Sequence, residues 1–208
     1  MNSAALDLPK IGSFLVFTPQ DLARFNKNMK LTTNNSALVL IDVQENLLPV
    51  MAEKELLIEK LSMLIRGARI FGLPIYWMEQ YPKGLGPTVG KLTGLLEGYH
   101  PISKTSFSAC GEEKFMERLK ADNRKHILVA GIESHVCVYQ TARDLVEQGY
   151  CVEVVVDATS SRCLQNKRVA MEKLGQLGGN TTSVEIALFD LLQTSDSPHF
   201  KPISRLVR

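Results

Sequence analysis

The sequence predicts an α/β fold in which a six-stranded parallel sheet lies between two layers of helices. Short apolar runs typical of buried strands alternate along the chain with stretches of helical periodicity. Alternation of this kind, with right-handed crossovers, gives one doubly wound parallel sheet in a three-layer α/β/α arrangement. The length of 208 residues suits one such domain with a sizeable core.

The first half of the chain supplies two strands and a helix. Ser36–Asp42 and Ile75–Glu79 are apolar runs that predict buried strands. Between them, Glu53–Phe71 carries an apolar stripe at helical spacing, and a Gly-Leu-Pro sequence ends the predicted helix. The Gly- and Pro-rich stretch from Tyr81 to about Tyr99 is expected to be a long loop, and such loops are usually functional.

The second half supplies four strands and three helices. The third strand is the short extended segment before Lys104, and a helix from Glu112 to about Asp122 leads to an apolar fourth strand. A helix after that strand carries Cys137. The last three elements are a strand at Tyr150–Val156, a helix at Gln165–Leu177 that ends at two glycines, and a strand at Thr181–Glu185.

Composition excludes several classes of function. The formal net charge is +2 and the basic residues are dispersed, which gives no sign of a nucleic-acid partner. No apolar run approaches the roughly 20 residues that span a bilayer. The four cysteines are widely spaced and no secretory signal precedes them, so we expect reduced thiols and a cytoplasmic location. The histidines lack zinc-ligand spacing, and no dinucleotide or Walker motif is present, so neither a metal nor a cofactor is expected.

Cys137 is the first candidate for chemistry. It should lie in the first turn of a helix, where free N–H groups and the helix dipole favour a thiolate. The alternative is a buried cysteine that packs as a small hydrophobe. Asp42 ends the first strand and Lys104 follows the third, so parallel strands would bring both to the same crevice. Taken separately, Asp42 could cap the next helix and Lys104 could form a surface ion pair. Together with the Cys137 thiol, they predict a nucleophile with a base, Asp42, and a charge stabiliser, Lys104.

In that order, Asp42, Lys104 and Cys137 resemble the Asp–Lys–Cys triad of the isochorismatase-like cysteine hydrolases. Five further motifs resemble the branch of isochorismatase domain-containing proteins: Glu79–Val89, Lys104–Ser108, Gly131–Glu133, Asp157–Arg162 and Pro198–Ile203. The resemblance covers roughly residues 34 to 206. It implies a Rossmann-like sheet with strand order 3-2-1-4-5-6 and a cis peptide between Ile132 and Glu133. Related nicotinamidases hold a metal after the second strand through Asp and His residues. Glu79, Gln80 and Tyr81 stand there instead, which argues against a metal.

The resemblance implies a hydrolase that cleaves a small amide or related C–N bond through a thioester-type intermediate. Two other hypotheses stay open: a binding or scaffold protein without useful turnover, and an isochorismate-type vinyl ether hydrolase. The expected partners are a small-molecule substrate and further copies of the chain in a homo-oligomer. The expected oxyanion donors are the backbone N–H groups of Glu133 and Cys137, and the side chains expected to line the pocket, or else to pack in the core, are Gln44, Tyr81, Phe107 and Tyr139.

The two ends of the chain extend the expected domain. Residues 1–33 fall outside the resemblance and are expected to form an extension ahead of a domain at 34–208. Thr18–Phe25 has an N-cap, a proline at the first helical position and an acidic first turn, which predict a short helix. Pro198–Arg208 carries four apolar side chains at helical spacing. This stripe must be covered either by its own domain or by a second subunit.

Overall fold

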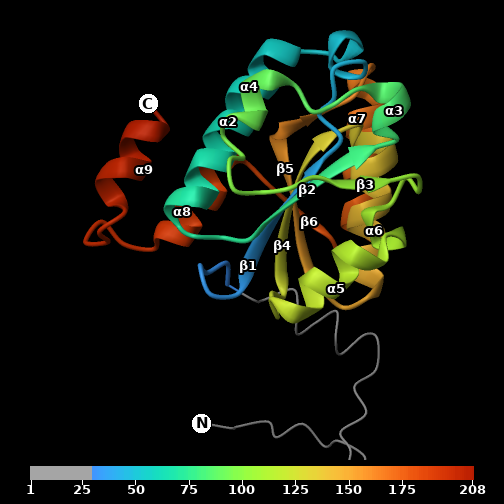
Figure 1. Ribbon diagram of the computed structural model, residues 1–208. Helices are drawn as coiled ribbons and strands as arrows, with labels where there is room; N and C mark the ends of the chain where they lie inside the picture. Colours follow the sequence, from blue (N-terminus) through green and yellow to red (C-terminus); the bar gives the residue numbers. More distant parts are fainter. Residues whose placement is uncertain (1–29) are drawn as a thin grey trace, which may run out of the picture.

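A computed structural model describes residues 30–208 and places a parallel six-stranded sheet between two layers of helices (Figure 1). Neighbouring strands follow the order β3-β2-β1-β4-β5-β6, which confirms the order implied by the resemblance. The strands are β1 (Ser36–Ile41), β2 (Ile75–Gln80), β3 (Ile102–Lys104), β4 (His126–Ile132), β5 (Cys151–Ser160) and β6 (Asn180–Thr182).

The helices divide between the two faces of the sheet (Figure 1). One face is covered by α2 (Lys54–Ile70), α8 (Val184–Leu192) and α9 (Phe200–Leu206), and the other by α5 (Glu113–Ala121), α6 (Tyr139–Glu147) and α7 (Leu164–Gln176). Two short helices, α3 (Pro82–Leu85) and α4 (Gly90–Thr93), lie between β2 and β3. Short 3₁₀ turns occupy Leu48–Val50 and Ala109–Gly111, and a π-helical segment occupies Ser134–Val138.

The central strand β1 explains why the sheet needs both layers. Leu38 and Leu40 pack into the cluster on the α2 side, whereas Ala37, Val39 and Ile41 pack into the cluster on the α5 side. All six residues of β1 are buried, so a continuous apolar run, rather than an alternating one, is what this position in the sheet requires. β1 therefore ends inside the protein, and Asp42 comes directly after it.

Two predicted elements differ from the structure. The stretch from Tyr81 to Tyr99 is not a plain loop, because it contains α3 and α4. The last strand ends at Thr182 instead of Glu185, since the Ser183 hydroxyl accepts a hydrogen bond from the Ile186 N–H and starts α8. Residues 183–185 were predicted to continue the strand, but the N-cap at Ser183 starts a helix there instead. The predicted helix at 18–25 lies outside the described residues.

The C-terminal stripe is covered by the chain's own domain. Helix α9 packs against α2 and α8, and its Ile203 side chain is completely buried. Phe200, Leu206 and Val207 pack at the edge of the same cluster. The chain's own domain therefore buries Ile203 completely and leaves Phe200, Leu206 and Val207 half-buried. None of the helices in residues 30–208 is long and apolar enough to cross a bilayer.

Candidate active site

Asp42 and Lys104 form a buried ion pair at the carboxyl edge of the sheet. The Lys104 Nζ lies 2.6 Å from the Asp42 Oδ2, and both side chains are completely shielded from solvent. Asp42 comes after the end of β1, and Lys104 is the last residue of β3. The two alternatives weighed from the sequence, a helix cap and a surface ion pair, are therefore wrong for these residues.

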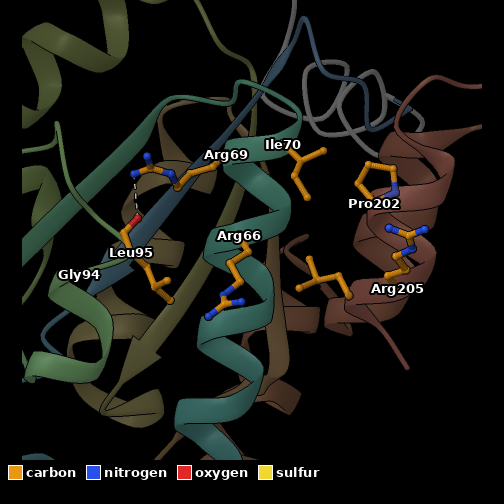
Figure 2. A pocket seen from close by; sticks show the side chains of 8 residues that line it. Arg66, Arg69, Ile70, Gly94, Leu95, Pro202 and Arg205 are labelled. Atoms are coloured by element: carbon orange, nitrogen blue, oxygen red, sulfur yellow. Dashed lines mark hydrogen bonds between the residues drawn. The ribbon is translucent and has the colours of Figure 1, made fainter.

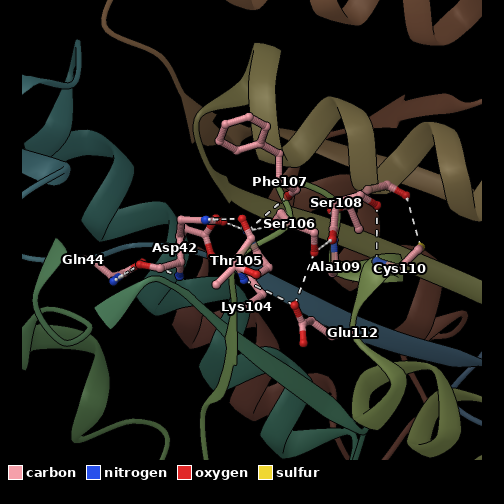
Figure 3. A network of polar contacts seen from close by, with 12 residues as sticks. Asp42, Gln44, Lys104, Thr105, Ser106, Phe107, Ser108, Ala109, Cys110 and Glu112 are labelled. Carbon is pink, nitrogen blue, oxygen red and sulfur yellow. Dashed lines mark hydrogen bonds and ion pairs between the residues drawn. The ribbon is translucent and has the colours of Figure 1, made fainter. Parts of the chain in front are cut away.

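Lys104 is held by three acceptors in addition to Asp42. Its ammonium donates to the Gln80 Oε1 at 2.6 Å, to the Phe107 carbonyl at 3.1 Å and to the Ser106 carbonyl at 3.3 Å. The segment after Lys104 is fixed in turn by Glu112, whose Oε1 accepts from the Thr105 N–H and the Ser106 hydroxyl (Figure 3). A saturated and immobilised ammonium of this kind is a fixed positive charge, which can position a carboxylate and stabilise negative charge next to it.

The second oxygen of Asp42 remains available. Oδ1 is buried and has no hydrogen-bond partner among residues 30–208 that meets the usual geometry. Burial raises the pKa of Asp42, and the Lys104 ammonium, the Cys137 thiol and the Gln80 backbone lower it again without cancelling the effect of burial. Asp42 is consequently a stronger base than an exposed carboxylate, and it has one oxygen free to accept a proton.

Cys137 lies against this ion pair as a neutral thiol. It is 6% exposed, and burial together with the nearby Asp42 charge raises its pKa to about 12, although Lys104 acts in the opposite direction. Cys137 belongs to the π-helical segment Ser134–Val138, which leads into α6, rather than to the first turn of a regular α-helix. The sequence-based argument for a thiolate considered only the helix start, whereas burial and the Asp42 charge raise the thiol pKa.

Gly131 allows β1 and β4 to approach each other beside the site. Its φ is +118°, and a Cβ at this position would lie 2.1 Å from the Ile41 carbonyl oxygen. Asp42 itself adopts a left-handed conformation with a φ of 52°, which is uncommon for a residue other than glycine. Such conformations concentrate at functional sites, where the surrounding structure holds them in place.

Glu133 lies between β4 and the segment that carries Cys137. The peptide bond from Ile132 to Glu133 is cis, as the resemblance implies. The Glu133 carboxylate accepts hydrogen bonds from the backbone N–H and the Nε of Arg162, both at 3.1 Å. His135 contacts the same loop, since its Nδ1 lies 3.0 Å from the Ser161 hydroxyl. The loop after β5 therefore fixes the backbone that leads to the thiol.

The four residues expected to line the pocket lie in different environments. Gln44 is completely buried, and its amide donates to the Gln80 and Gly86 carbonyls and accepts from the Gln80 N–H. It therefore ties the loop after β2 to the end of β1. Tyr81 and Phe107 are each 54% exposed, and their backbones bond to Lys104 through the Tyr81 N–H and the Phe107 carbonyl. Tyr139 is half-buried, with the Lys173 ammonium 5.6 Å from its ring centre.

Three residues that hold the site, Gln80, Thr141 and Arg162, had no direct signal in the sequence. Gln80 was noted within the Glu79–Val89 motif and in the argument against a metal but was given no role, yet its side chain accepts a hydrogen bond from Lys104. The Thr141 hydroxyl accepts from the Ala109 N–H at 2.9 Å and so ties the segment after Lys104 to α6. A polar residue at the end of β2 was the one available signal, because neighbouring parallel strands end at the same edge. Within residues 30–208, no group of three or more His, Cys, Asp or Glu side chains could hold a metal.

Comparison with known proteins assigns the family. Residues 36–186 match the model of the isochorismatase domain, so the chain belongs to the isochorismatase family. It is 36% identical over 178 residues to isochorismatase domain-containing protein 2 of Danio rerio, covering 86% of this chain and 89% of the relative.

Solved structures with the same fold include two relatives with different names. A structure described as the MAR1 ribonuclease of Caenorhabditis elegans has a TM-score of 0.82 and 38% identity, and the match covers 86% of this chain and 92% of that one. The YcaC gene product of Escherichia coli, described as an octameric hydrolase of unknown specificity, has a TM-score of 0.79 and 23% identity, with coverage of 86% and 95%. The second likeness shows the fold alone.

Proposed function

We propose that this chain is a cysteine hydrolase that cleaves a small amide or related C–N bond with Asp42, Lys104 and Cys137. The observation that carries the proposal is that the two oxygens of the Asp42 carboxylate have different surroundings. One oxygen is bonded to Lys104, and the other is free beside a buried thiol. A base, a fixed cation and a nucleophile are the groups that covalent acyl transfer needs in contact with one another.

In the first half of the reaction, the proton of Cys137 Sγ passes to Asp42 Oδ1 as Sγ bonds to the substrate carbonyl carbon. Because the resting thiol has a pKa of about 12, this proton moves during the attack and not before it. The carbonyl oxygen becomes an oxyanion and accepts hydrogen bonds from the N–H groups of Glu133 and Cys137. When the C–N bond breaks, Asp42 returns the proton to the leaving nitrogen, which departs as a neutral amine or ammonia.

In the second half, water hydrolyses the thioester. Asp42 takes one proton from the water as its oxygen bonds to the acyl carbon, and the C–S bond then breaks. The Cys137 sulfur recovers the proton from Asp42, so the acyl group leaves as an acid and the site returns to its starting state. The Lys104 ammonium donates to four acceptors, including Asp42, and keeps Asp42 in place.

The surroundings of the site favour an apolar or aromatic acyl group. Tyr81 and Phe107 are exposed and their backbones bond to Lys104, and Tyr139 begins the helix after Cys137. Aromatic rings in these places offer flat apolar contact area with few polar anchors. Gln44 supports the site indirectly. Its amide nitrogen donates to the Gln80 and Gly86 carbonyls and so holds the loop that carries Tyr81.

The proposal is tested by trapping the acyl group on the thiol. We expect a panel of small aliphatic and aromatic amides to include substrates that add an acyl mass to Cys137, detected by peptide mass spectrometry. Cys137→Ser should abolish turnover and Asp42→Asn should reduce it by several orders of magnitude, whereas Cys163→Ser, an exposed control, should retain it. Full turnover by Cys137→Ser, or acylation of another residue, would contradict the proposal.

The competing activities are separated by the same variants. The C. elegans relative is described as a ribonuclease, so RNA belongs in the assay panel. RNA cleavage that is lost in Cys137→Ser, without any amide turnover, would replace the amide proposal. Isochorismate hydrolysis would indicate the vinyl ether alternative. Tight ligand binding without turnover of any of these compounds would indicate the scaffold alternative.

We also infer a homo-oligomer and a cytoplasmic location. The octameric description of E. coli YcaC and the two exposed aromatic rings beside Lys104 support association. All four cysteines are free, which suits a reducing compartment. Light scattering that gives the 23.1 kDa monomer at low micromolar concentration would contradict the oligomer, and detection of the native protein only in a secreted fraction would contradict the location.

A further inference from the structure

We propose that a groove between α2 and α9 binds a small molecule that carries a phosphate monoester next to an apolar body. The groove has a volume of about 530 Å³ and is lined by residues of the outer helices α2 and α9 (Figure 2). The Asp42–Lys104 pair lies elsewhere, at the edge of the sheet where β1 and β3 end. The volume is within the range of about 300–1,000 Å³ that is usual for small-molecule sites. The proposal is independent of the hydrolase chemistry, because it uses none of the same side chains.

Two helices and one loop supply the walls of the groove. Arg66, Arg69 and Ile70 come from α2, Leu95 lies just after α4, and α9 contributes Pro202, Arg205 and Leu206. Figure 2 shows Ile70 of α2 facing Pro202 of α9, whereas the Arg69 side chain extends to the other side of α2, towards Leu95. The docking of α9 on α2, which buries Ile203, therefore also builds this groove.

The positive charges of the groove are not neutralised. Its lining contains three arginines and no carboxylate. Arg66 and Arg205 are exposed, and neither guanidinium forms a hydrogen bond or ion pair with any residue from 30 to 208. Since the whole chain has a formal net charge of only +2, three arginines in the lining of one groove are a local concentration of charge. Such an arrangement raises the local concentration of anions.

Arg69 is held in place while the other two arginines remain free. Its Nη1 donates to the Leu95 carbonyl at 2.8 Å and to the Glu97 carbonyl at 2.9 Å, and its guanidinium lies 5.8 Å from the centre of the Tyr99 ring. Both carbonyls accept from the same guanidinium nitrogen, Nη1. The Nη2 and Nε of Arg69 have no hydrogen-bond partner among the described residues. One arginine is thus preorganised at the groove, and preorganisation lowers the entropic cost of binding a ligand.

The chemistry of the walls selects the class of ligand. Arginine binds phosphate through paired N–H donors, and a dianionic headgroup can engage more than one guanidinium. Ile70, Leu95, Pro202 and Leu206 add an apolar surface beside these donors. A phosphate monoester with an aromatic or aliphatic body matches both features, whereas inorganic phosphate matches only the charge and a neutral alcohol only the apolar wall.

The test is calorimetric titration of the full chain with phenyl phosphate, with inorganic phosphate and benzyl alcohol as partial ligands. We expect saturable binding with one phenyl phosphate per chain, weaker binding of both partial ligands, and loss of affinity as salt is added. The double variant Arg66→Gln/Arg205→Gln should bind phenyl phosphate at least about tenfold more weakly. Arg69 is left intact because it anchors the loop at Leu95.

A matched double variant on the opposite face, Lys114→Gln/Arg118→Gln, removes the same charge and should bind as the unmodified chain does. Equal weakening in both double variants, or no saturation by phenyl phosphate, would overturn the proposal. A change from oligomer to monomer in the groove variant alone would assign the groove to contact between copies and would also overturn it. Co-sedimentation with phosphatidic acid vesicles, lost in the groove variant, would support the same chemistry with a lipid headgroup as its source.

Discussion

Replacing Lys104 with methionine isolates the part of the site that holds Asp42 ionised. Methionine keeps an unbranched apolar side chain of similar length and removes the ammonium. In the variant, Asp42 loses its 2.6 Å partner while its other oxygen still has no hydrogen-bond partner among residues 30–208. Three further acceptors, on Gln80, Ser106 and Phe107, lose their donor at the same time.

The expected cost can be worked out from this arrangement. Removing one partner of a buried ion pair destabilises a protein by about 3–5 kcal/mol, because the remaining charge is left without compensation. Asp42→Asn should cost less, since the Lys104 ammonium would keep its three other acceptors. The double variant Lys104→Met/Asp42→Asn should recover much of the loss, because neither charge is then buried alone.

The loss in Lys104→Met should depend on pH. Burial already raises the pKa of Asp42, and the ammonium opposes this effect, so its removal raises the pKa further. A carboxyl whose pKa is higher in the folded state contributes stability below its unfolded pKa and loses it as pH rises through the folded value. The variant should therefore be closer to the unmodified protein at about pH 5 than at about pH 8.

Urea denaturation at the two pH values measures this difference. Lys114→Met, which removes an exposed ammonium from α5, is the matched control and should change the free energy of unfolding by no more than about 0.5 kcal/mol. The reasoning would be refuted if Lys104→Met were as stable as the unmodified protein at about pH 8. It would also be refuted if the loss were the same at both pH values.

Three further outcomes are expected from the structure. Gly131→Ala should lower both stability and thiol acylation, because its Cβ would lie 2.1 Å from the Ile41 carbonyl oxygen and displace the end of β1; unchanged activity would contradict this. Burial alone would lower the pKa of His126, but hydrogen bonds to Cys151 and Glu153 raise it to about 9, so this residue contributes stability below its unfolded value of about 6.5 that is lost as pH rises towards 9; His126→Gln should flatten the unfolding free energy across that window. Ile203→Ala should cost about 2–5 kcal/mol in chemical denaturation, because the side chain is fully buried under α2, and a smaller loss would mean that α9 is loosely docked.

Elements that depend on local patterns could be located from the sequence. Long apolar runs and a 3.6-residue period identified β1 and α2 to within about two residues, because burial on both faces or on one stripe leaves a direct trace in residue type. The third strand is only three residues long, so its position was inferred from the Lys104 segment and not from a pattern of its own. Helix α8 was missed because its first turn reads as an extension of a strand until Ser183 is recognised as a cap.

The electrostatic state of the site could not be read in the same way. From the sequence, the position of Cys137 near a helix start predicted a thiolate, because a helix dipole is a local property. The pKa of about 12 arises instead from burial and from the charge of Asp42, whose strand lies almost a hundred residues earlier in the chain. Lys104 lowers that pKa but is already committed to four acceptors. The raised pKa disfavours the thiolate, and burial limits the access of reagents to the sulfur. Simple alkylating reagents should therefore modify the exposed Cys163 before Cys137.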